Sequence, residues 1–272
     1  MTNRIETAFA RVRDEGRVGV IPYVTVGFPE LADTVPIVTA IEAAGADIIE
    51  LGVPYSDPLA DGPSIQAASY RALQNGVTPA HCIAIVRELR TAGVQVPLLF
   101  MGYYNLILSY GIEAYARDCA EAGLDGLIVP DLPSEEDATI RAALSANGLT
   151  LTPLLAPTSP EERIRKACAS ADGFIYCVSV VGVTGARSEL PANLGDFLAR
   201  VRRHTNLPLA VGFGISERRH VEQLAGIAQA AVVGSRVIDV INSAPPDERA
   251  QHAGDYVAEL AGRTQPTEDR KS

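Results

Sequence analysis

The stretch DTVPIVTAIEAAGADIIEL, residues 33–51, contains the unit from which the whole chain is built. Apolar residues recur at helical spacing over residues 33–44, and a glycine follows at position 45, as is typical after a helix. Residues 46–51 then form a short, mostly apolar run with β-branched side chains. Because this run lacks polar alternation, it predicts a strand that is buried on both faces of a parallel sheet.

The same alternation of helical patterns and apolar runs extends along the chain. Eight runs predict strands, at residues 18–26, 46–51, 96–102, 126–130, 149–155, 173–178, 208–212 and 228–233. Helical patterns lie between them, at residues 33–44, 79–92, 112–122, 135–146, 160–169, 194–204 and 217–224. Eight strand–helix units in series suit a closed barrel, so we predict an α/β protein with a (β/α)8 TIM barrel fold. An open, doubly wound sheet is the alternative, disfavoured because no GxGxxG follows the first strand.

Length and composition narrow the class of protein further. The 272 residues suit one barrel domain, expected at residues 1–263, with a disordered C-terminal tail at 264–272. A formal net charge of −10 argues against nucleic-acid binding, and no apolar stretch is long enough to cross a membrane. The start of the chain has no signal-peptide pattern, and the four cysteines have no metal-site spacing. We therefore expect a cytoplasmic protein with reduced thiols.

Few titratable side chains fall at the carboxyl ends of the predicted strands, where barrels of this kind carry reactive groups. The lysines and histidines instead lie in helical patterns or in the tail (Lys166, Lys271, His81, His204, His220 and His252). This placement disfavours a Schiff-base lysine, a histidine base and a metal site built on imidazoles.

Carboxylates remain as the candidate catalytic groups. Glu50 closes the second predicted strand, and Asp61 follows eleven residues later in a loop stiffened by proline and glycine. One fixed carboxylate and one on a loop over the same barrel mouth would form an acid/base pair. Two plainer interpretations stay open: Glu50 as a strand-edge partner of an arginine, and Asp61 as an ordinary turn residue before glycine.

Glycine-rich turns follow the last three predicted strands, at residues 182–185, 212–214 and 234–235, the last of them opening a short helix at 236–241. Loops after strands seven and eight, together with the N-terminus of a short helix, are the usual phosphate site of these barrels. Backbone N–H groups can hold such an anion without lysine. The turns therefore predict a phosphorylated ligand.

At this point the sequence resembles a known family. Residues 50–66, ELGVPYSDPLADGPSIQ, are similar to the signature of the tryptophan synthase α chain family, which usually has phenylalanine where this chain has Tyr55. The stretches GLIVPDLP at 126–133, GVTG at 182–185 and GFGIS at 212–216 also match, in family order, between about residues 5 and 262. The resemblance implies reversible retro-aldol cleavage of indole-3-glycerol phosphate into indole and glyceraldehyde 3-phosphate. It also implies that the chain needs no cofactor or metal, and that it assembles with a β chain in an α2β2 tetramer.

The resemblance also assigns roles to individual residues. The catalytic acids of the family fall on Glu50 and Asp61. Thr184 matches a loop threonine that closes toward the aspartate, and Tyr176 a tyrosine that lines the site. The phosphate-binding turns fall on Gly185, Gly214, Gly234 and Ser235. The residues expected to enclose the indole are Tyr23, Leu99, Leu127 and Phe213.

Three other functions are weighed against this one. The chain could be a standalone lyase that releases free indole, a non-catalytic activator of a β chain, or another phosphate-binding isomerase or synthase barrel. Intact Glu50 and Asp61 argue against the non-catalytic activator, and the absence of a strand-end lysine argues against the other barrels. Leu106 departs from the proline that the family commonly has on a loop meeting the β chain. This departure is the only feature that bears on partner docking.

Overall fold

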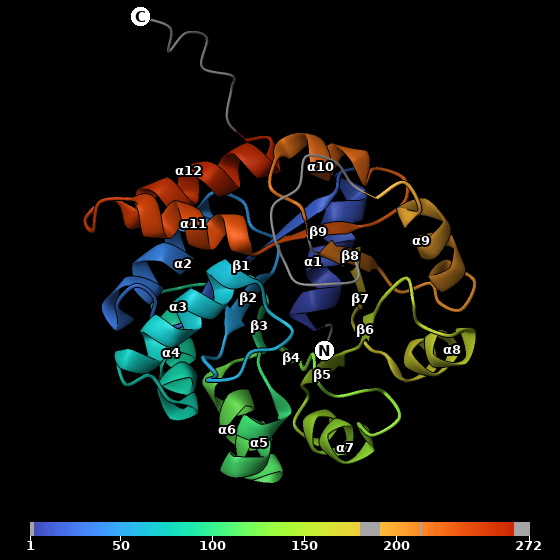
Figure 1. The fold of residues 1–272 in the computed structure, drawn as a ribbon, viewed down its shortest axis with the longest axis horizontal. Helices are drawn as coiled ribbons and strands as arrows, with labels where there is room; N and C mark the ends of the chain where they lie inside the picture. The colour runs from blue at the N-terminus through green and yellow to red at the C-terminus, as the bar shows by residue number, and fades with distance from the viewer. Residues whose placement is uncertain (1–2, 180–190, 213, 264–272) are drawn as a thin grey trace, which may run out of the picture.

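The central sheet of the computed structural model is a ring of parallel strands (Figure 1). The structure describes residues 3–179, 191–212 and 214–263. Within them the strands run in the order β5-β4-β3-β2-β1-β9-β8-β7-β6. Their bounds are β1 Gly19–Thr25, β2 Ile49–Gly52, β3 Leu98–Met101, β4 Gly126–Ile128, β5 Thr150–Thr152, β6 Leu154–Leu155, β7 Ile175–Val178, β8 Leu209–Gly212 and β9 Ala230–Val233.

The described residues form nine strands instead of the eight predicted, because the run at 149–155 is divided at Pro153. Proline has no N–H to donate to a strand ladder, so it interrupts regular pairing. The piece before it, β5, pairs with β4, and the piece after it, β6, pairs with β7. The two ends of the strand order therefore come from one continuous segment, which closes the barrel. The predicted TIM barrel is confirmed, and the open sheet is not formed.

Helices surround the barrel, as Figure 1 shows. Each predicted helical pattern contains a helix, although the ends differ by a few residues. These helices are α2 Thr34–Ala43, preceded by the 3-10 turn Leu31–Asp33, and α4 Pro79–Thr91, α6 Ile112–Ala122, α7 Ala138–Ala146, α8 Glu161–Ser170, α9 Leu194–Arg202 and α10 Arg218–Gln223. The others are α1 Arg4–Asp14, α3 Pro63–Gln74, α5 Tyr104–Tyr110, α11 Ser235–Ser243 and α12 Arg249–Ala261. None of the described helices is long and apolar enough to span a bilayer.

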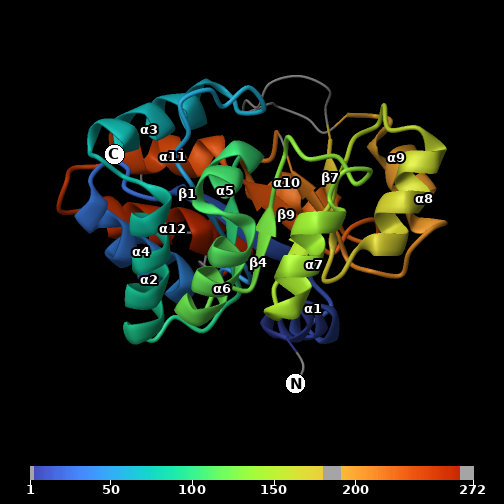
Figure 2. The same ribbon diagram turned by 90° about the horizontal axis from the view of Figure 1, so that it is seen from below.

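The two ends of the barrel are closed differently. Helix α1 lies across the end where the strands begin, and Figure 2 shows it on the side away from α3. Its buried face includes Ile5 and Phe9, and the Phe9 ring lies 5.4 Å from that of Phe174. The loops that follow the strands gather at the other end. The carboxyl ends of the strands are therefore the expected position of the site.

The predicted tail at residues 264–272 lies outside the described residues. The assignment of residues 1–263 to one barrel domain stays a prediction. The cysteines of the chain, Cys82, Cys119, Cys168 and Cys177, are all buried and free of disulfide bonds.

Candidate active site

Glu50 occupies the second position of β2, in the middle of a buried apolar strand. Its side chain has no exposed surface, and neither carboxylate oxygen has a hydrogen-bond partner among the described residues. Burial raises the pKa of Glu50 to about 8. A strand-edge glutamate paired with arginine is therefore the wrong interpretation. A buried carboxyl group without partners stays protonated at neutral pH.

The side chain of Glu50 faces the inside of the barrel. Tyr23 on β1 and Tyr176 on β7 lie close enough to both Glu50 and Asp61 to feel their charges. Burial is the main reason why the pKa of each phenol lies well above its ordinary value, and the carboxylates raise it further. Because β2 and β7 stand far apart in the strand order, these side chains can meet only across the barrel interior.

Asp61 lies on the loop between β2 and α3 and is also buried. Its backbone N–H donates to the Pro58 carbonyl at 3.0 Å, and its carbonyl accepts from Gln66 Nε2 at 2.9 Å. The Tyr103 hydroxyl donates to Asp61 Oδ2 at 3.1 Å. Burial raises the pKa of Asp61 to about 6, and the bond from Tyr103 opposes that rise. Although Asp61 is held by a turn, its buried carboxylate is aimed at the same interior as Glu50.

Glycine at the ends of β2 and β8 makes room for the tyrosines. A Cβ atom at Gly52 would collide with the hydroxyl of Tyr23, and a Cβ atom at Gly212 would collide with the hydroxyl of Tyr176. Both tyrosine rings are buried, so neither can swing aside to make room for a Cβ atom. The glycines in the two matched motifs therefore fix where the rings cross the barrel mouth.

The apolar residues expected around an indole divide into two groups. Leu99 pairs in register with Glu50, so alternation along the strands places both side chains on the interior face. Leu127 pairs with Phe100 in the alternate row, and it lines a small apolar cavity together with Phe100 and Tyr115. This cavity lies toward α5 and α6. The structure therefore does not bring Leu127 to the carboxylates, which corrects that expectation.

Sequence reasoning missed two interior residues of the next row. Met101 pairs with Gly52, and Ile128 pairs with Met101, so both share the interior face one step nearer the barrel mouth. Both are buried. Counting two residues onward from Leu99 on β3 would have found Met101, because side chains on a strand alternate.

The predicted phosphate turns are described in part. Gly214 has a left-handed backbone with φ of +85°, and Gly234 is the N-cap of α11, which begins at Ser235. The first backbone N–H groups of a helix have no partner within the helix and attract anions. The predicted helix at 236–241 is thus part of a longer one. Thr184, Gly185 and Phe213 lie outside the described residues.

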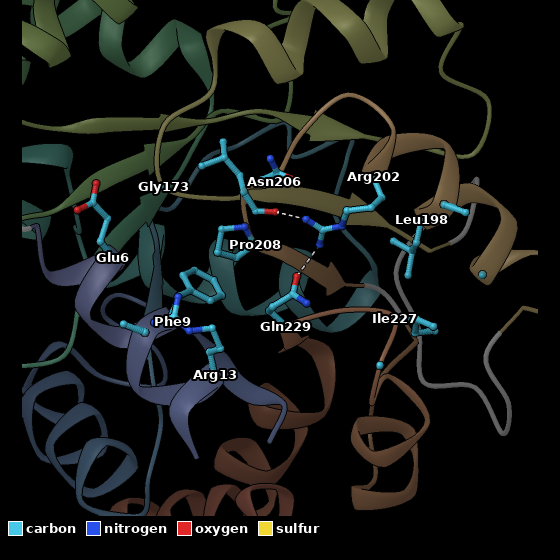
Figure 3. Close-up of a pocket in the computed structure, with 15 residues that line it drawn as sticks. Glu6, Phe9, Arg13, Gly173, Leu198, Arg202, Asn206, Pro208, Ile227 and Gln229 are labelled. Atoms are coloured by element: carbon cyan, nitrogen blue, oxygen red, sulfur yellow. Dashed lines mark hydrogen bonds between the residues drawn. The ribbon is translucent and has the colours of Figure 1, made fainter. Parts of the chain in front are cut away.

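A cavity of about 640 Å³ lies at the opposite end of the barrel, between α1, α9 and the segments that precede β8 and β9 (Figure 3). Arg202, one of the charged side chains in its lining, already donates to Gln229 Oε1 at 2.7 Å and to the Leu207 carbonyl at 2.8 Å. This cavity contains neither of the carboxylates described above. Among the described residues, no cluster of His, Cys, Asp and Glu could hold a metal ion.

Comparisons with known proteins identify the family. The sequence profile of the family described as tryptophan synthase alpha chain matches residues 9–266. The chain is 52% identical to the tryptophan synthase alpha chain of Chloroflexus aggregans over 263 residues, which cover 97% of this chain and 98% of that one. It is 53% identical to that of Roseiflexus sp. over 260 residues, covering 96% and 100%. Among solved structures, a chain of tryptophan synthase from Mycobacterium tuberculosis superposes with a TM-score of 0.87 at 35% identity, covering 96% and 98%. The chain therefore belongs to the tryptophan synthase alpha chain family.

Proposed function

We propose that this chain cleaves indole-3-glycerol phosphate into indole and glyceraldehyde 3-phosphate, with Glu50 and Asp61 as its catalytic residues. The observation that carries the proposal is the pair of buried carboxyl groups, both with raised pKa values, that share one barrel interior with Tyr23 and Tyr176. Pairs of acids tuned to different pKa values are the usual basis of acid–base catalysis. Membership of the family supports the substrate and the carbon–carbon lyase reaction.

Glu50 acts as the general acid. Because its pKa is about 8, its carboxyl group carries a proton at pH 7. Indole is a poor carbanion leaving group, so C3 of the ring must gain a proton before the carbon–carbon bond breaks. A buried carboxyl group near the operating pH is suited to this transfer.

Asp61 acts as the electrostatic partner. Its pKa of about 6 leaves most of the carboxylate ionised at pH 7. Protonation at C3 places positive charge toward the ring nitrogen, and a carboxylate in a water-poor site stabilises that charge. The two acids therefore act in opposite protonation states.

The bond cleavage completes the cycle. The Glu50 carboxylate takes the proton of the glycerol hydroxyl as the aldehyde C=O forms. The electrons of the broken C–C bond return to the ring and restore neutral indole. Glu50 is then protonated again, so no cofactor or external reductant is needed.

The other residues proposed for the site bind the phosphate or enclose the indole. Gly214, Gly234 and Ser235 would hold the phosphate through backbone N–H groups, with Gly185 adding to them. Tyr23, Leu99, Tyr176 and Phe213 would enclose the indole, with Thr184 closing on Asp61. Met101 and Ile128 join this set, since they share the interior face with Leu99.

A β chain is the proposed partner, in an α2β2 tetramer, because indole released by an uncoupled chain would diffuse away. Leu106 bears on this docking less than its sequence position implies. It lies in the first turn of α5 and lines the apolar cavity beside Leu127, so its side chain packs inward. We place the protein in the cytoplasm, which the four unpaired, buried cysteines support.

The decisive experiment is the turnover of indole-3-glycerol phosphate by the isolated chain and its variants. Glu50→Gln removes the proton donor but keeps the shape, so indole release should fall by about a thousandfold or more. Phosphate binding, measured with glyceraldehyde 3-phosphate, should be kept. Continued indole release by the Gln variant would overturn the role of Glu50. An inactive wild-type chain that still stimulates a β chain would support the activator instead.

A further inference from the structure

The hydroxyl group of Tyr103 connects the loop between β2 and α3, which carries Asp61, to the start of α5. Tyr103 is buried and directly precedes α5, two residues after the end of β3. The N–H of Ala60 donates to the Tyr103 hydroxyl at 3.0 Å, and that hydroxyl donates to Asp61 Oδ2 at 3.1 Å. The loop therefore meets the same hydroxyl through its backbone and through its carboxylate.

The donor and the acceptor of each of these two hydrogen bonds are fixed by chemistry. A phenol has one proton to donate, and the backbone N–H of Ala60 can only donate. The Tyr103 oxygen therefore accepts from Ala60 and gives its own proton to Asp61. Burial is the main reason why the pKa of Tyr103 is raised, and the nearby Asp61 charge adds to it, so the phenol keeps this proton. A hydrogen bond from a phenol to a carboxyl oxygen is stronger when the carboxyl group is ionised, so this bond favours the carboxylate form of Asp61.

The ring of Tyr103 is held from the other side as well. It stacks on Tyr55 with ring centroids 4.8 Å apart and an interplanar angle of 26°. Tyr55 is fixed in turn by Ser69 on α3, whose hydroxyl accepts from the Tyr55 N–H at 2.9 Å and donates to the Tyr55 carbonyl at 3.2 Å. The hydroxyl is thus supported by a rigid stack that is anchored on α3.

The other titratable groups that face this pair are acids and phenols. Glu50, Tyr23 and Tyr176 share the interior with it, and the charge of Asp131 acts on Tyr103. No arginine or lysine among residues 3–179, 191–212 and 214–263 forms an ion pair with Asp61. Glu50 by contrast receives no hydrogen bond at all from the described residues.

The geometry points to Tyr103 as a positioning residue that keeps Asp61 ionised and aimed into the barrel, and thereby separates its role from that of Glu50. This inference rests on the proposed function for its catalytic consequence, whereas its effect on Asp61 can be measured without substrate. Because Tyr103 acts through Asp61, its effect on the Asp61 titration and its effect on catalysis are tested separately.

The test is the titration of Asp61 in the full chain, with and without Tyr103→Phe, which keeps the ring and the stack. Aspartate labelled with carbon-13 at the carboxyl group is observed by NMR without substrate, and Asp61→Asn assigns the signal. Losing one hydrogen bond to the carboxylate should move the Asp61 titration roughly one pH unit higher. The acid limb of the pH–rate profile should move with it, and kcat at pH 6 should fall about fivefold with KM changed far less.

Tyr110→Phe is the matched control, since it removes a tyrosine hydroxyl on α5 that donates to Asp118 Oδ2 on α6 at 2.8 Å, away from Asp61. It should leave the Asp61 titration and kcat as in the wild type. An unmoved Asp61 titration in Tyr103→Phe overturns the inference, including when kcat falls, because Tyr103 would then act only as a structural residue. A moved titration with an unchanged pH–rate profile supports the positioning of Asp61 and overturns its proposed catalytic role.

Discussion

Two buried acidic side chains where the strands begin, Asp47 and Asp125, differ in their partners from two at the barrel mouth, Glu50 and Asp61. At the end where the strands begin, Asp47 and Asp125 are each paired with two arginines. At the other end, Glu50 and Asp61 have no such partner among the described residues. All four side chains are buried. Burial alone therefore does not decide what a carboxylate does in this fold.

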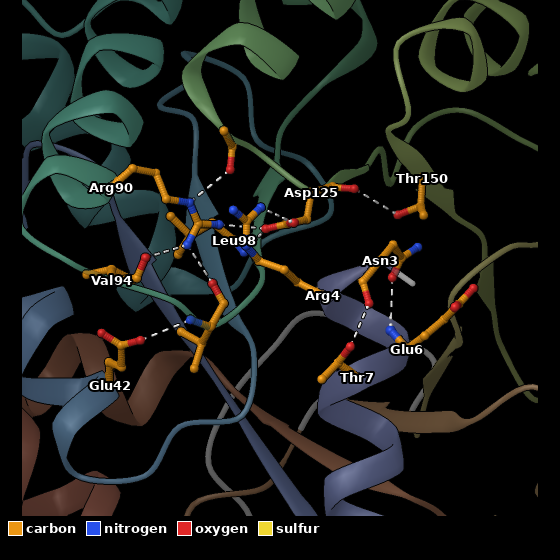
Figure 4. Close-up of polar contacts among 12 residues, drawn as sticks. Asn3, Arg4, Glu6, Thr7, Glu42, Arg90, Val94, Leu98, Asp125 and Thr150 are labelled. Carbon is orange, nitrogen blue, oxygen red and sulfur yellow. Dashed lines mark hydrogen bonds and ion pairs between the residues drawn. The ribbon is translucent and has the colours of Figure 1, made fainter. Parts of the chain in front are cut away.

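Asp125 shows how complete the pairing is (Figure 4). Arg90 Nη2 donates to it at 2.6 Å and Arg4 Nη1 at 3.0 Å, while the N–H of Leu98 donates at 2.9 Å. Arg90 also donates to the carbonyls of Val94 at 2.8 Å and Val96 at 2.9 Å, so its guanidinium has backbone partners besides Asp125. This cluster ties α1 and α4 to the entrance of β3.

Asp47 is held in the same way. Arg17 donates to both of its oxygens, at 2.7 and 2.8 Å, Arg11 donates at 2.8 Å, and the N–H of Val20 donates at 3.0 Å. Burial by itself would raise the pKa of Asp47, but these hydrogen bonds outweigh it and lower the pKa. The arginines around Asp47 therefore favour its charged form, whereas Glu50 at the barrel mouth has no such partner and keeps its proton at neutral pH.

The largest expected effect on stability comes from breaking a paired cluster. Asp125→Asn removes the charge that two arginines share, and removing one partner of a buried ion pair costs about 3–5 kcal/mol. We expect the free energy of unfolding, measured in urea at pH 7, to fall by about 3 kcal/mol. The kcat of folded protein should stay within twofold. A loss below about 1 kcal/mol would mean that water replaces Asp125 as the partner of the two arginines. It would contradict the idea that pairing with arginine stabilises this end of the barrel.

Glu50→Gln should have the opposite effect on stability. The folded pKa of about 8 lies above the ordinary value of 4.5, so the folded state binds this proton more tightly than the unfolded state. The stability associated with Glu50 is complete below pH 4.5 and is lost as the pH rises through 8. We expect equal unfolding free energies for variant and wild type near pH 4, and a variant more stable by on the order of 3 kcal/mol at pH 8.

Asp47 provides the internal control for this experiment. Its folded pKa is lowered, so its stabilisation is present above the unfolded value and is lost as the pH falls through the folded value. Asp47→Asn should therefore differ most from wild type at neutral pH and least in acid. If both variants gave the same slope against pH, burial rather than pairing would control these groups.

Much of this arrangement could be predicted from the sequence. Apolar runs predicted the barrel, because strands buried on both faces need apolar residues at every position. The scarcity of strand-end lysine and histidine led to Glu50 and Asp61, both of which are buried at the barrel mouth. The split at Pro153 was not predicted, although the missing N–H of proline is readable from the sequence.

The misplaced Leu127 and the missed Tyr103 have different physical causes. Leu127 was expected near the indole, yet the alternation of the strand turns it toward the helices, and a run apolar at every position does not reveal which face is which. Tyr103 was missed because its role depends on a hydroxyl that meets a loop 42 residues away in sequence. Such contacts are set by the closure of the barrel, which spacing along the chain does not encode.

The smallest expected effect separates pairing from burial at the same end of the barrel. Arg13 and Arg17 both carry ion pairs, but the pair of Arg13 with Asp14 leaves the two side chains 73% and 70% exposed, while Arg17 contacts the buried Asp47. Exposed pairs contribute little, because water and salt screen them. Arg13→Ala should leave the melting temperature within measurement error, and Arg17→Ala should lower it by several degrees. Equal shifts in the two variants would show that the exposed and buried arginines stabilise this end alike, and that the buried carboxylate is not what makes Arg17 important.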